Sequence, residues 1–186
     1  WHDKRIGVVS VEGLIVRGAS RRSPLPIPLL GGNATAGSTT VAQALRSAEQ
    51  DDDIAAVLLF VDSQGGDALA SDLMAREIKR LRTKKPVVAY MGGVAASGGY
   101  YVSALAQHIT ARPLTITGSI GVISMKPHTQ GVYERLSLHR QSLARGANAA
   151  LYSDLEPLDA QSRAVMERSI GRVYDDFKTV VAEGRG

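Results

Sequence analysis

The sequence predicts an α/β fold with parallel βαβ units, flanking helices and a long C-terminal helix. Two observations carry this prediction. Strand-like and helix-like segments alternate from residue 6 onward, and right-handed crossovers turn such an order into a parallel sheet. The run 54–61 (IAAVLLFV) contains no polar residue, which is typical of a strand buried on both faces of a parallel sheet.

The N-terminal half provides two strands, a loop and two helices. Residues 6–16 are strand-like with a bend at Gly13, and residues 17–37, rich in Gly, Pro, Ser and Arg, are expected to form a long exposed loop. A helix capped by one of residues 38–40 is expected to reach about residue 50. After the strand at 54–61, residues 67–83 are expected to form a helix. Its buried candidates are Leu69, Leu73, Ala75 and Ile78.

The C-terminal half continues this alternation. We expect a short buried strand at 86–91, a buried helix at 100–109, a short strand or turn at 115–123 and a helix at 132–138. A long amphipathic helix at 158–183 follows. Its apolar side is drawn from Val165, Met166, Ile170, Val173, Phe177 and Val181.

Length and composition indicate one large globular domain over residues 1–186. The 44% hydrophobic and 22% charged residues are ordinary for such a domain. The formal charge of +4 is mild, and the densest basic stretch, 79–85, ends a predicted helix, where cations are favourable. We therefore expect no nucleic-acid partner. The absence of cysteine excludes disulfides, thiol nucleophiles and thiolate metal sites.

The segment 86–111 contains no Lys, Arg, Asp or Glu and is long enough to suggest a membrane span. Its four glycines and its polar residues favour a buried strand, turn and helix instead. No N-terminal targeting segment is visible. Because the chain starts almost directly with a strand and ends in a helix-like stretch, we expect it to be a piece of a longer protein.

The most informative stretch is 92–101 (GGVAASGGYY), where one serine, Ser97, lies between glycine pairs. It is expected at a strand-to-helix turn, where unpaired backbone N–H groups favour negative charge. Such a turn can hold a nucleophile together with its oxyanion. The alternative interpretation is that Ser97 is a small N-cap residue.

A second glycine turn occurs at 61–67 (VDSQGGD), also between a buried strand and a helix. Ligands of open parallel sheets bind beyond the carboxyl ends of the strands. We therefore expect Gly65 and Gly66 to lie near Ser97, so that one turn supplies a nucleophile and the other an oxyanion hole. The alternative is two tight turns without function.

Other chemistries find little support. The chain has no Gly-Lys pair for a P-loop and no Gly-Xaa-Gly-Xaa-Xaa-Gly motif. Its four histidines lack the His-Xaa-Xaa-Xaa-His spacing of a metal site, so we expect neither metal nor cofactor. Ala95 replaces the first glycine of a Gly-Xaa-Ser-Xaa-Gly elbow, and Ser-Xaa-Xaa-Lys is absent.

Four blocks of the chain resemble the signal peptide peptidase A (protease IV) family of serine peptidases, whose core is similar to Clp protease and crotonase. They span most of residues 4–124 in family order and at compatible spacing. The Ala-Ala-Ser-Gly-Gly-Tyr-Tyr and Thr-Gly-Ser-Ile-Gly-Val signals are specific. The blocks are IGVVSVEGLI (6–15), VDSQGGDALASDLMAREI (61–78), KPVVAYMGGVAASGGYYVSALAQHI (85–109) and LTITGSIGVIS (114–124).

The resemblance implies a Ser–Lys dyad with Ser97 as the nucleophile. Gly65 and Gly66 match the family's Pro-Gly-Gly turn, which contributes to the oxyanion hole together with the N–H of Gly98; Gln64 replaces the proline. Ser119 matches a serine that helps to position the catalytic lysine. The lysine itself is the serious departure, because Ala149 stands in its place.

Three explanations compete for the missing lysine. In tandem-domain members of the family the C-terminal half carries the serine and the N-terminal half carries the lysine, and residues 37–40 (GSTT) resemble such C-terminal halves. Alternatively, lysine was replaced by Ala149 to trap an inactive enzyme. The third explanation is natural loss of activity or another base, such as Lys126, His128 or His139, none of which stands at a catalytic position of these families.

The resemblance implies a peptidase that degrades signal peptides and other membrane-derived peptides. It also implies a homo-oligomer and an extracytoplasmic catalytic part that is membrane-associated through a segment absent from this chain. The tandem-domain explanation adds an upstream lysine-bearing half as a partner. Two alternatives are a catalytically silent scaffold half of a peptidase assembly and a crotonase-like acyl-thioester enzyme.

Overall fold

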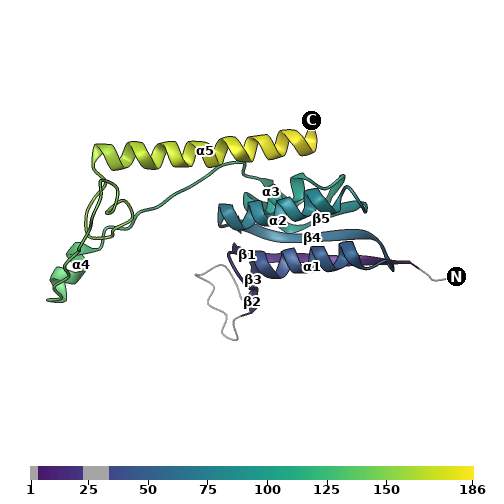
Figure 1. The fold of residues 1–186 in the computed structure, drawn as a ribbon, viewed down its shortest axis with the longest axis horizontal. Coiled ribbons are helices and arrows are strands. Elements are labelled where there is room, and N and C mark those ends of the chain that lie inside the picture. Colours follow the sequence, from purple (N-terminus) through teal and green to yellow (C-terminus); the bar gives the residue numbers. More distant parts are fainter. Residues whose placement is uncertain (1–3, 23–33) are drawn as a thin grey trace. The chain divides into compact units, whose positions relative to one another are not determined.

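The computed structural model describes residues 4–22 and 34–186 (Figure 1). Its contacts divide these residues into two compact units. The first contains the described residues up to Gly121 together with Asp176–Gly186, and the second is Val122–Asp175. Each unit is described by itself.

The first unit is built on a seven-stranded sheet in the order β2-β3-β1-β4-β5-β6, with β7 also paired to β5. All pairs are parallel except β2 with β3. The predicted α/β class with a parallel sheet is therefore confirmed. The strands are β1 (Arg5–Val16), β2 (Arg21–Arg22), β3 (Ala34–Gly37), β4 (Ile54–Gly66), β5 (Val87–Ala96), β6 (His108–Ala111) and β7 (Ile116–Gly118).

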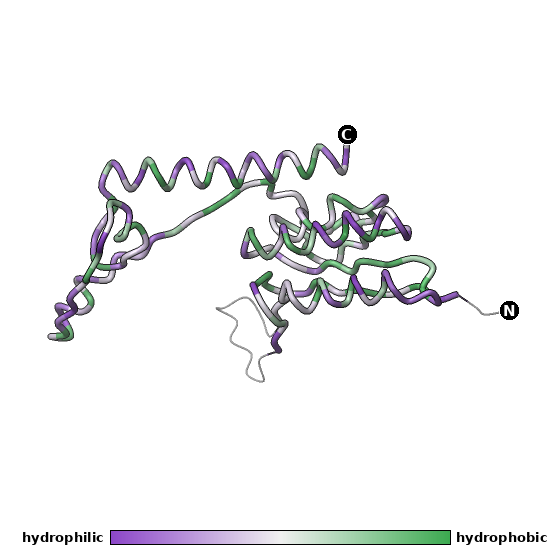
Figure 2. The backbone as a smooth tube through the Cα atoms, viewed as in Figure 1, coloured by the Kyte–Doolittle hydropathy of each residue, from purple (hydrophilic) through white to green (hydrophobic). Residues whose placement is uncertain are grey.

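Three helices pack on one face of this sheet: α1 (Ser38–Gln50), α2 (Ala68–Leu81) and α3 (Gly98–Ala104). The strand residues on that face alternate along each strand and are almost fully buried, because successive side chains of a strand point to opposite faces. They form one apolar core with the helices, and the tube of Figure 2 is green along much of these strands. The buried strand residues include Val9, Val11, Val57, Leu59, Val61, Val87, Ala89 and Met91.

The buried side of α2 differs from the expected one. Leu69 and Leu73 are 53% and 42% exposed, so their prediction as core residues was wrong, whereas Ala75 and Ile78 are buried. The buried side instead follows Ala70 and Met74, one residue further along at helical spacing. Two leucines therefore remain accessible at the start of α2.

The opposite face of the sheet is more open. Ile6 and Val8 of β1 are 68% and 63% exposed. On the neighbouring strands Phe60 stacks on Tyr90 with ring centroids 6.0 Å apart, and Arg112 Nε donates to the Tyr90 hydroxyl at 2.6 Å. This face is thus partly covered by its own aromatic side chains.

One predicted helix was wrong in its second half. The segment expected as a helix from 100 to 109 forms α3, which ends at Ala104, and then β6, which pairs with β5. Gln107 fixes the change, since its N–H donates to Val87 O and its side-chain Oε1 accepts from the Val87 N–H. Both hydrogen bonds direct the chain alongside β5 rather than around another helical turn.

Several elements differ from expectation in their length. β4 and β5 continue past the predicted ends at 61 and 91, through the glycine-containing stretches and up to the two turns. Within the expected loop at 17–37, β2 and β3 pair antiparallel, and residues 23–33 lie outside the described residues. The strand or turn expected at 115–123 is the three-residue strand β7.

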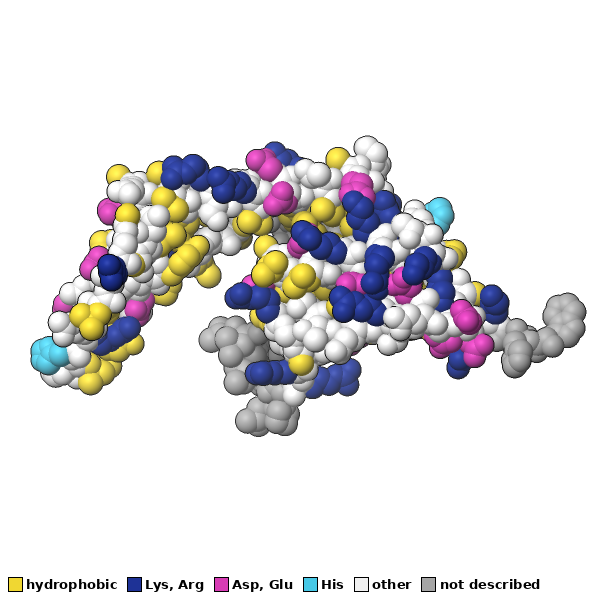
Figure 3. Space-filling view, viewed as in Figure 1, with side chains coloured by type: hydrophobic (Ala, Val, Ile, Leu, Met, Phe, Trp, Pro, Cys, Tyr) yellow, Lys and Arg dark blue, Asp and Glu magenta, His cyan; other side chains and the backbone are white. Residues whose placement is uncertain are grey.

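An ion-pair cluster joins α1 to α2, and Figure 3 shows Lys, Arg, Asp and Glu side chains gathered over these helices. The buried Glu49 carboxylate contacts Arg80 Nη2 at 2.5 Å and also pairs with Lys84. Glu77 pairs with Arg46 and Arg80. The basic stretch at the end of α2 is therefore engaged in structural ion pairs, as its position at a helix end indicates.

The second unit contains α4 (Gln130–Arg135), the turns that follow it and the first part of α5 (Ala160–Arg185). The last residues of α5 belong to the first unit. There the ring centroids of Phe177 and Tyr101 are 5.0 Å apart. Arg185 Nε donates to Ala104 O at 3.1 Å, and Lys79 Nζ pairs with Glu183 at 2.8 Å. The end of the long helix therefore packs on the core that carries α3.

Among the described residues, every helix is too short or too polar to span a lipid bilayer.

Candidate active site

Ser97 lies between the end of β5 and the start of α3, at the expected strand-to-helix turn. Its backbone has φ 50° and ψ −119°, a conformation that L-residues rarely adopt. Its N–H donates to Gly118 O at 2.9 Å and its carbonyl accepts from the Tyr101 N–H at 2.8 Å. Ser97 occupies the N-cap position of α3, but its side chain makes no cap hydrogen bond.

The second glycine turn lies directly against Ser97. A Cβ built on Gly65 would be 2.6 Å from Gly98 N and 2.9 Å from Ser97 Cβ. Gly65 and Gly66 have φ of 99° and 155°, backbone angles that residues with a side chain rarely adopt. The structure therefore brings together the two turns that the sequence singled out, and only a residue without a side chain fits at position 65.

The N–H groups of this turn point to different sides. The Gly65 N–H donates to Ser63 Oγ at 3.0 Å, and the Asp67 N–H donates to Ile15 O of β1 at 2.9 Å. The Gly66 nitrogen lies toward α3, 3.3 Å from a Cβ built on Gly98. The N–H of Gly65 is thus already engaged, which leaves Gly66 and Gly98 as the pair of donors that can face one oxygen beside Ser97.

The glycines after Ser97 are required by packing. A Cβ on Gly98 would lie 2.5 Å from Ser71 Oγ of α2, and one on Gly99 would lie 2.5 Å from Ser63 O of β4. These distances are shorter than real Cβ contacts. The start of α3 therefore packs directly on the backbone of β4 and on the Ser71 side chain of α2. The Gly98 N–H, as the first of the helix, has no partner within it.

Ser119 follows β7, which pairs with the last residues of β5 in the register Ala96 with Gly118. Because Gly118 O accepts from the Ser97 N–H, Ser119 is one residue from a direct backbone contact of Ser97. Its φ is 50° and its side chain is exposed. The structure thus places Ser119 directly after the strand that borders the Ser97 turn.

Several lysines of the first unit lie at the opposite end of the strands. Lys84 pairs with Glu49, and Lys85 Nζ donates to Ala48 O at 2.8 Å, just before β5 begins. Ser97 follows the other end of β5, which at about 3.3 Å per residue is roughly 30 Å away. Ala149, at the position expected for the lysine, lies in the second unit, where its N–H donates to Gly146 O at 3.2 Å.

Tyr101 lies on α3, one turn after Ser97. Burial, together with the Asp72 carboxylate that accepts from its hydroxyl at 3.1 Å, raises the pKa of Tyr101 above its ordinary value. Its hydroxyl therefore stays protonated at neutral pH and acts as a donor to Asp72. The described ranges hold no group of three or more His, Cys, Asp or Glu side chains that could bind a metal ion.

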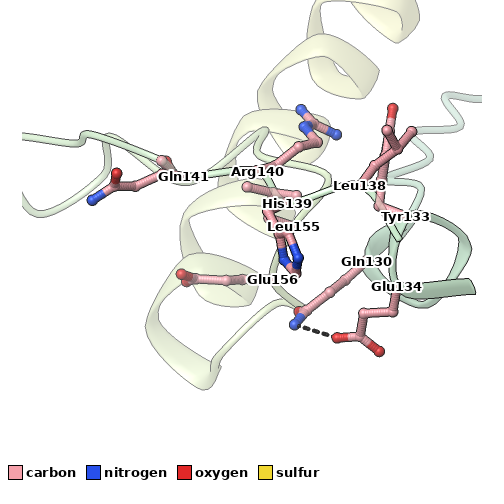
Figure 4. Close-up of a pocket in the computed structure, with 10 residues that line it drawn as sticks. Gln130, Tyr133, Glu134, Leu138, His139, Arg140, Gln141, Leu155 and Glu156 are labelled. Carbon is pink, nitrogen blue, oxygen red and sulfur yellow. Dashed lines mark hydrogen bonds between the residues drawn. The ribbon is translucent and has the colours of Figure 1, made fainter. Parts of the chain in front are cut away.

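The histidines weighed as alternative bases lie in the second unit. His139 lines a cavity of about 380 Å³ formed by α4 and the following turns (Figure 4). Arg140, on the same cavity, lies 4.4 Å from the centre of the Tyr133 ring and pairs with Asp154 at 2.8 Å. A ring nitrogen of His128 lies 3.1 Å from Leu155 O. The contacts of Arg140 and His128 are internal to this unit.

The sequence did not predict the residues that contact the two glycine turns and hold them in place. Ser63 hydrogen-bonds within the turn, Gly13 accepts from it, and Ser71 lies under Gly98. The signal was a serine two residues before a glycine pair. Its meaning depends on the bulge in β1 at Gly13, which local sequence does not specify.

Comparison with known proteins gives a consistent picture. The profile described as Peptidase family S49 matches residues 79–186. The chain is 39% identical to the chloroplastic serine protease SPPA of Arabidopsis thaliana, covering 92% of this chain and 25% of that protein. It is 36% identical to Protease 4 of Haemophilus influenzae, covering 97% of this chain and 28% of that protein. The chain thus spans about a quarter of the length of these relatives.

Two further likenesses are more distant or shorter. A putative protease of Methanocaldococcus jannaschii is 38% identical over 74% of this chain and 44% of its own length. Among solved structures, the 1510-N membrane-bound stomatin-specific protease in complex with a substrate peptide is 20% identical, with a TM-score of 0.44 over 69% of this chain and 50% of that chain.

Proposed function

The chain belongs to peptidase family S49, and from this premise we propose that it is the serine-bearing part of an endopeptidase that uses a Ser–Lys dyad. The observation that carries the proposal is the contact between Ser97 and the glycine turn, where a Cβ on Gly65 would meet both Ser97 and the Gly98 nitrogen. The Ser97 hydroxyl, which makes no cap hydrogen bond, then lies close to the backbone nitrogens of Gly66 and Gly98. This is the arrangement that acyl transfer requires.

In the proposed reaction the Ser97 hydroxyl attacks the carbonyl carbon of a peptide bond while a neutral lysine amine accepts its proton. The Gly66 and Gly98 N–H groups donate to the oxyanion of the tetrahedral intermediate. The lysine then protonates the leaving amine, and water attacks the acyl-enzyme with the same amine as base. A lysine that is neutral near pH 7 needs burial to depress its pKa.

The lysine is supplied, in this proposal, by another part of the complete protein or by a lysine at the position of Ala149. Within the first unit, Lys84 and Lys85 are engaged at the far end of the strands from Ser97 and do not fit this role. Ser119, directly after the strand that borders the Ser97 turn, is proposed to hold the incoming amine by a hydrogen bond. This role agrees with its exposure.

We further propose signal peptides and other membrane-derived peptides as substrates, cleaved by a membrane-associated homo-oligomer with its catalytic part outside the cytoplasm. The exposed Leu69 and Leu73 on the first turns of α2, which begins directly after the glycine turn, supply apolar surface for such substrates.

The test is active-site labelling of the complete protein with a fluorophosphonate, read by mass spectrometry, together with hydrolysis of a signal peptide. We expect the label on Ser97, and loss of label and hydrolysis in Ser97→Ala. Ser103→Ala is the matched control, because Ser103 is equally small, fully buried on α3 and bonded to Gly99 O at 2.8 Å.

The outcomes separate the alternatives. Absence of label in an intact, folded assembly would contradict the proposed function and favour a silent scaffold. Hydrolysis of an acyl thioester without peptide cleavage would contradict it in favour of thioester chemistry.

A further inference from the structure

Ser63 is a buried polar residue that the proposed reaction does not use directly. It lies in β4, two residues before Gly65, and is 1% exposed. Its backbone supports α3, because Ser63 O would lie 2.5 Å from a Cβ on Gly99. Ser63 therefore sits beneath the turn that carries Ser97.

The Ser63 hydroxyl makes two hydrogen bonds in this place. It donates to Gly13 O of β1 at 2.5 Å and accepts from the Gly65 N–H at 3.0 Å. Gly13 has φ 74°, and the β1–β4 register shifts between Glu12 and Leu14. One hydroxyl thus joins a bulged strand to the first glycine of the turn.

This link decides which N–H of the turn is left for a substrate. The bonds of the Gly65 N–H to Ser63 and of the Asp67 N–H to Ile15 O fix the peptide units 64–65 and 66–67, which flank the unit that carries the Gly66 N–H. The Gly66 N–H is then held toward Gly98. If the Gly65 N–H lost its acceptor, the peptide between Gln64 and Gly65 could rotate, because glycine at φ 99° resists such rotation poorly.

We propose that Ser63 is a positioning residue that holds the Gly66 N–H in place for the oxyanion beside Ser97. The inference rests on the proposed peptidase function and adds a residue that touches neither substrate nor nucleophile. Replacement by alanine would leave a buried donor on Gly65 and a partly buried acceptor on Gly13 without their partner. The turn can satisfy them only by shifting, and a shift of about 1 Å costs roughly 100-fold in rate.

The test compares Ser63→Ala with Ser103→Ala in the complete protein. Both variants remove one buried serine hydroxyl that donates to a backbone carbonyl, but only Ser63 is bonded to the glycine turn. For S63A we expect kcat for peptide hydrolysis to fall by about 10- to 100-fold with KM within about twofold. For S103A we expect both constants within about threefold of the wild type. Ser63→Thr, which restores the hydroxyl, should recover part of the loss.

A second readout separates this role from general damage to the fold. A peptide aldehyde, whose adduct with Ser97 needs the oxyanion donors, should bind S63A about 10- to 100-fold more weakly. The affinity for the noncovalent product peptide should be unchanged. If S63A does not fold, Ser63→Cys carries the same comparison, because a thiol keeps the size but bonds weakly, and we expect an intermediate loss.

The results distinguish the role of Ser63 from the proposed peptidase function. A wild-type protein that is labelled at Ser97 and active, with S63A indistinguishable from S103A in kcat and aldehyde affinity, would overturn the role of Ser63 and leave the peptidase function standing. An equal loss of aldehyde and product-peptide binding in S63A would also overturn it. A wild-type protein without label at Ser97 would overturn the function and this inference together.

Discussion

Replacing Gly65 by alanine tests the central contact of the site. The new Cβ would lie 2.6 Å from Gly98 N, 2.9 Å from Ser97 Cβ and 3.0 Å from Ala96 O, and the residue would have to keep φ 99°. The unfavourable backbone conformation costs about 1–3 kcal/mol. Overpacking against backbone that cannot yield adds about 1–3 kcal/mol.

These contributions set the expected size of the effect. A loss of about 2–6 kcal/mol in the free energy of unfolding corresponds to roughly 5–20 °C in melting temperature for a chain of this length. The fluorophosphonate labelling rate of Ser97 should fall by at least about 100-fold, because the Cβ separates the Gly98 N–H from the Gly66 N–H.

Gly18→Ala is the matched control, since Gly18 has φ 86° but no atom lies within 4 Å of the place that a Cβ would take there. It carries the backbone cost without the contact, so the difference between the two melting temperatures measures the contact alone. Calorimetry gives the melting temperatures and time-resolved labelling gives the rate. If G65A melted within about 2 °C of G18A and labelled at the wild-type rate, the contact between the two turns would be refuted.

Three further predictions concern the scaffold. Hydrogen bonding to Lys84, with the charge of Arg80, holds the pKa of Glu49 below its ordinary 4.5. The Glu49 carboxylate therefore stabilises the fold fully above about pH 4.5, and this stabilisation is lost as the pH falls through the lower folded-state pKa. Glu49→Gln should lower the melting temperature at pH 7, and its difference from the wild type should shrink in acid. Arg140 and then Thr129 lower the pKa of Asp154 to about 2, so hydrogen-exchange protection of the 129–155 segment should fall in Asp154→Asn at pH 7, and in the wild type between about pH 3.8 and 2. Phe177→Ala should reduce the unfolding free energy in urea by about 3–5 kcal/mol, because a 4% exposed ring leaves the core; an unchanged midpoint would show that α5 does not stabilise the first unit.

The fold was predictable where one local signal dominated. The unbroken apolar run at 54–61 identified β4, and the glycine pairs identified the two turns. The expected burial of this run on both faces was wrong, because only alternate residues from Val57 onward are fully buried. The segment after Ala104 was not predictable in the same way. His108–Ala111 is a strand because Gln107 bonds both polar groups of Val87, which lies 20 residues earlier in the chain. A contact of this range has no trace in local periodicity.

The candidate site divides along the same line. Ser97, Gly65 and Gly66 stand out as residue types that a strand-to-helix turn needs, and the structure brings them into contact. The engagement of the Gly65 N–H could not be foreseen, because it depends on a bulge that places Gly13 O within 2.5 Å of the Ser63 hydroxyl. Which backbone donors remain free at a turn is decided by such tertiary contacts.

The backbone angles at Ser97 are unfavourable for any residue that has a side chain. At φ 50° and ψ −119° glycine is the favoured residue, and the serine hydroxyl makes no cap hydrogen bond that would offset the strain. Replacing Ser97 by glycine should therefore abolish the proposed peptidase activity and raise the free energy of unfolding. The Ser97→Gly variant would therefore be suited to capturing peptide substrates that remain uncleaved.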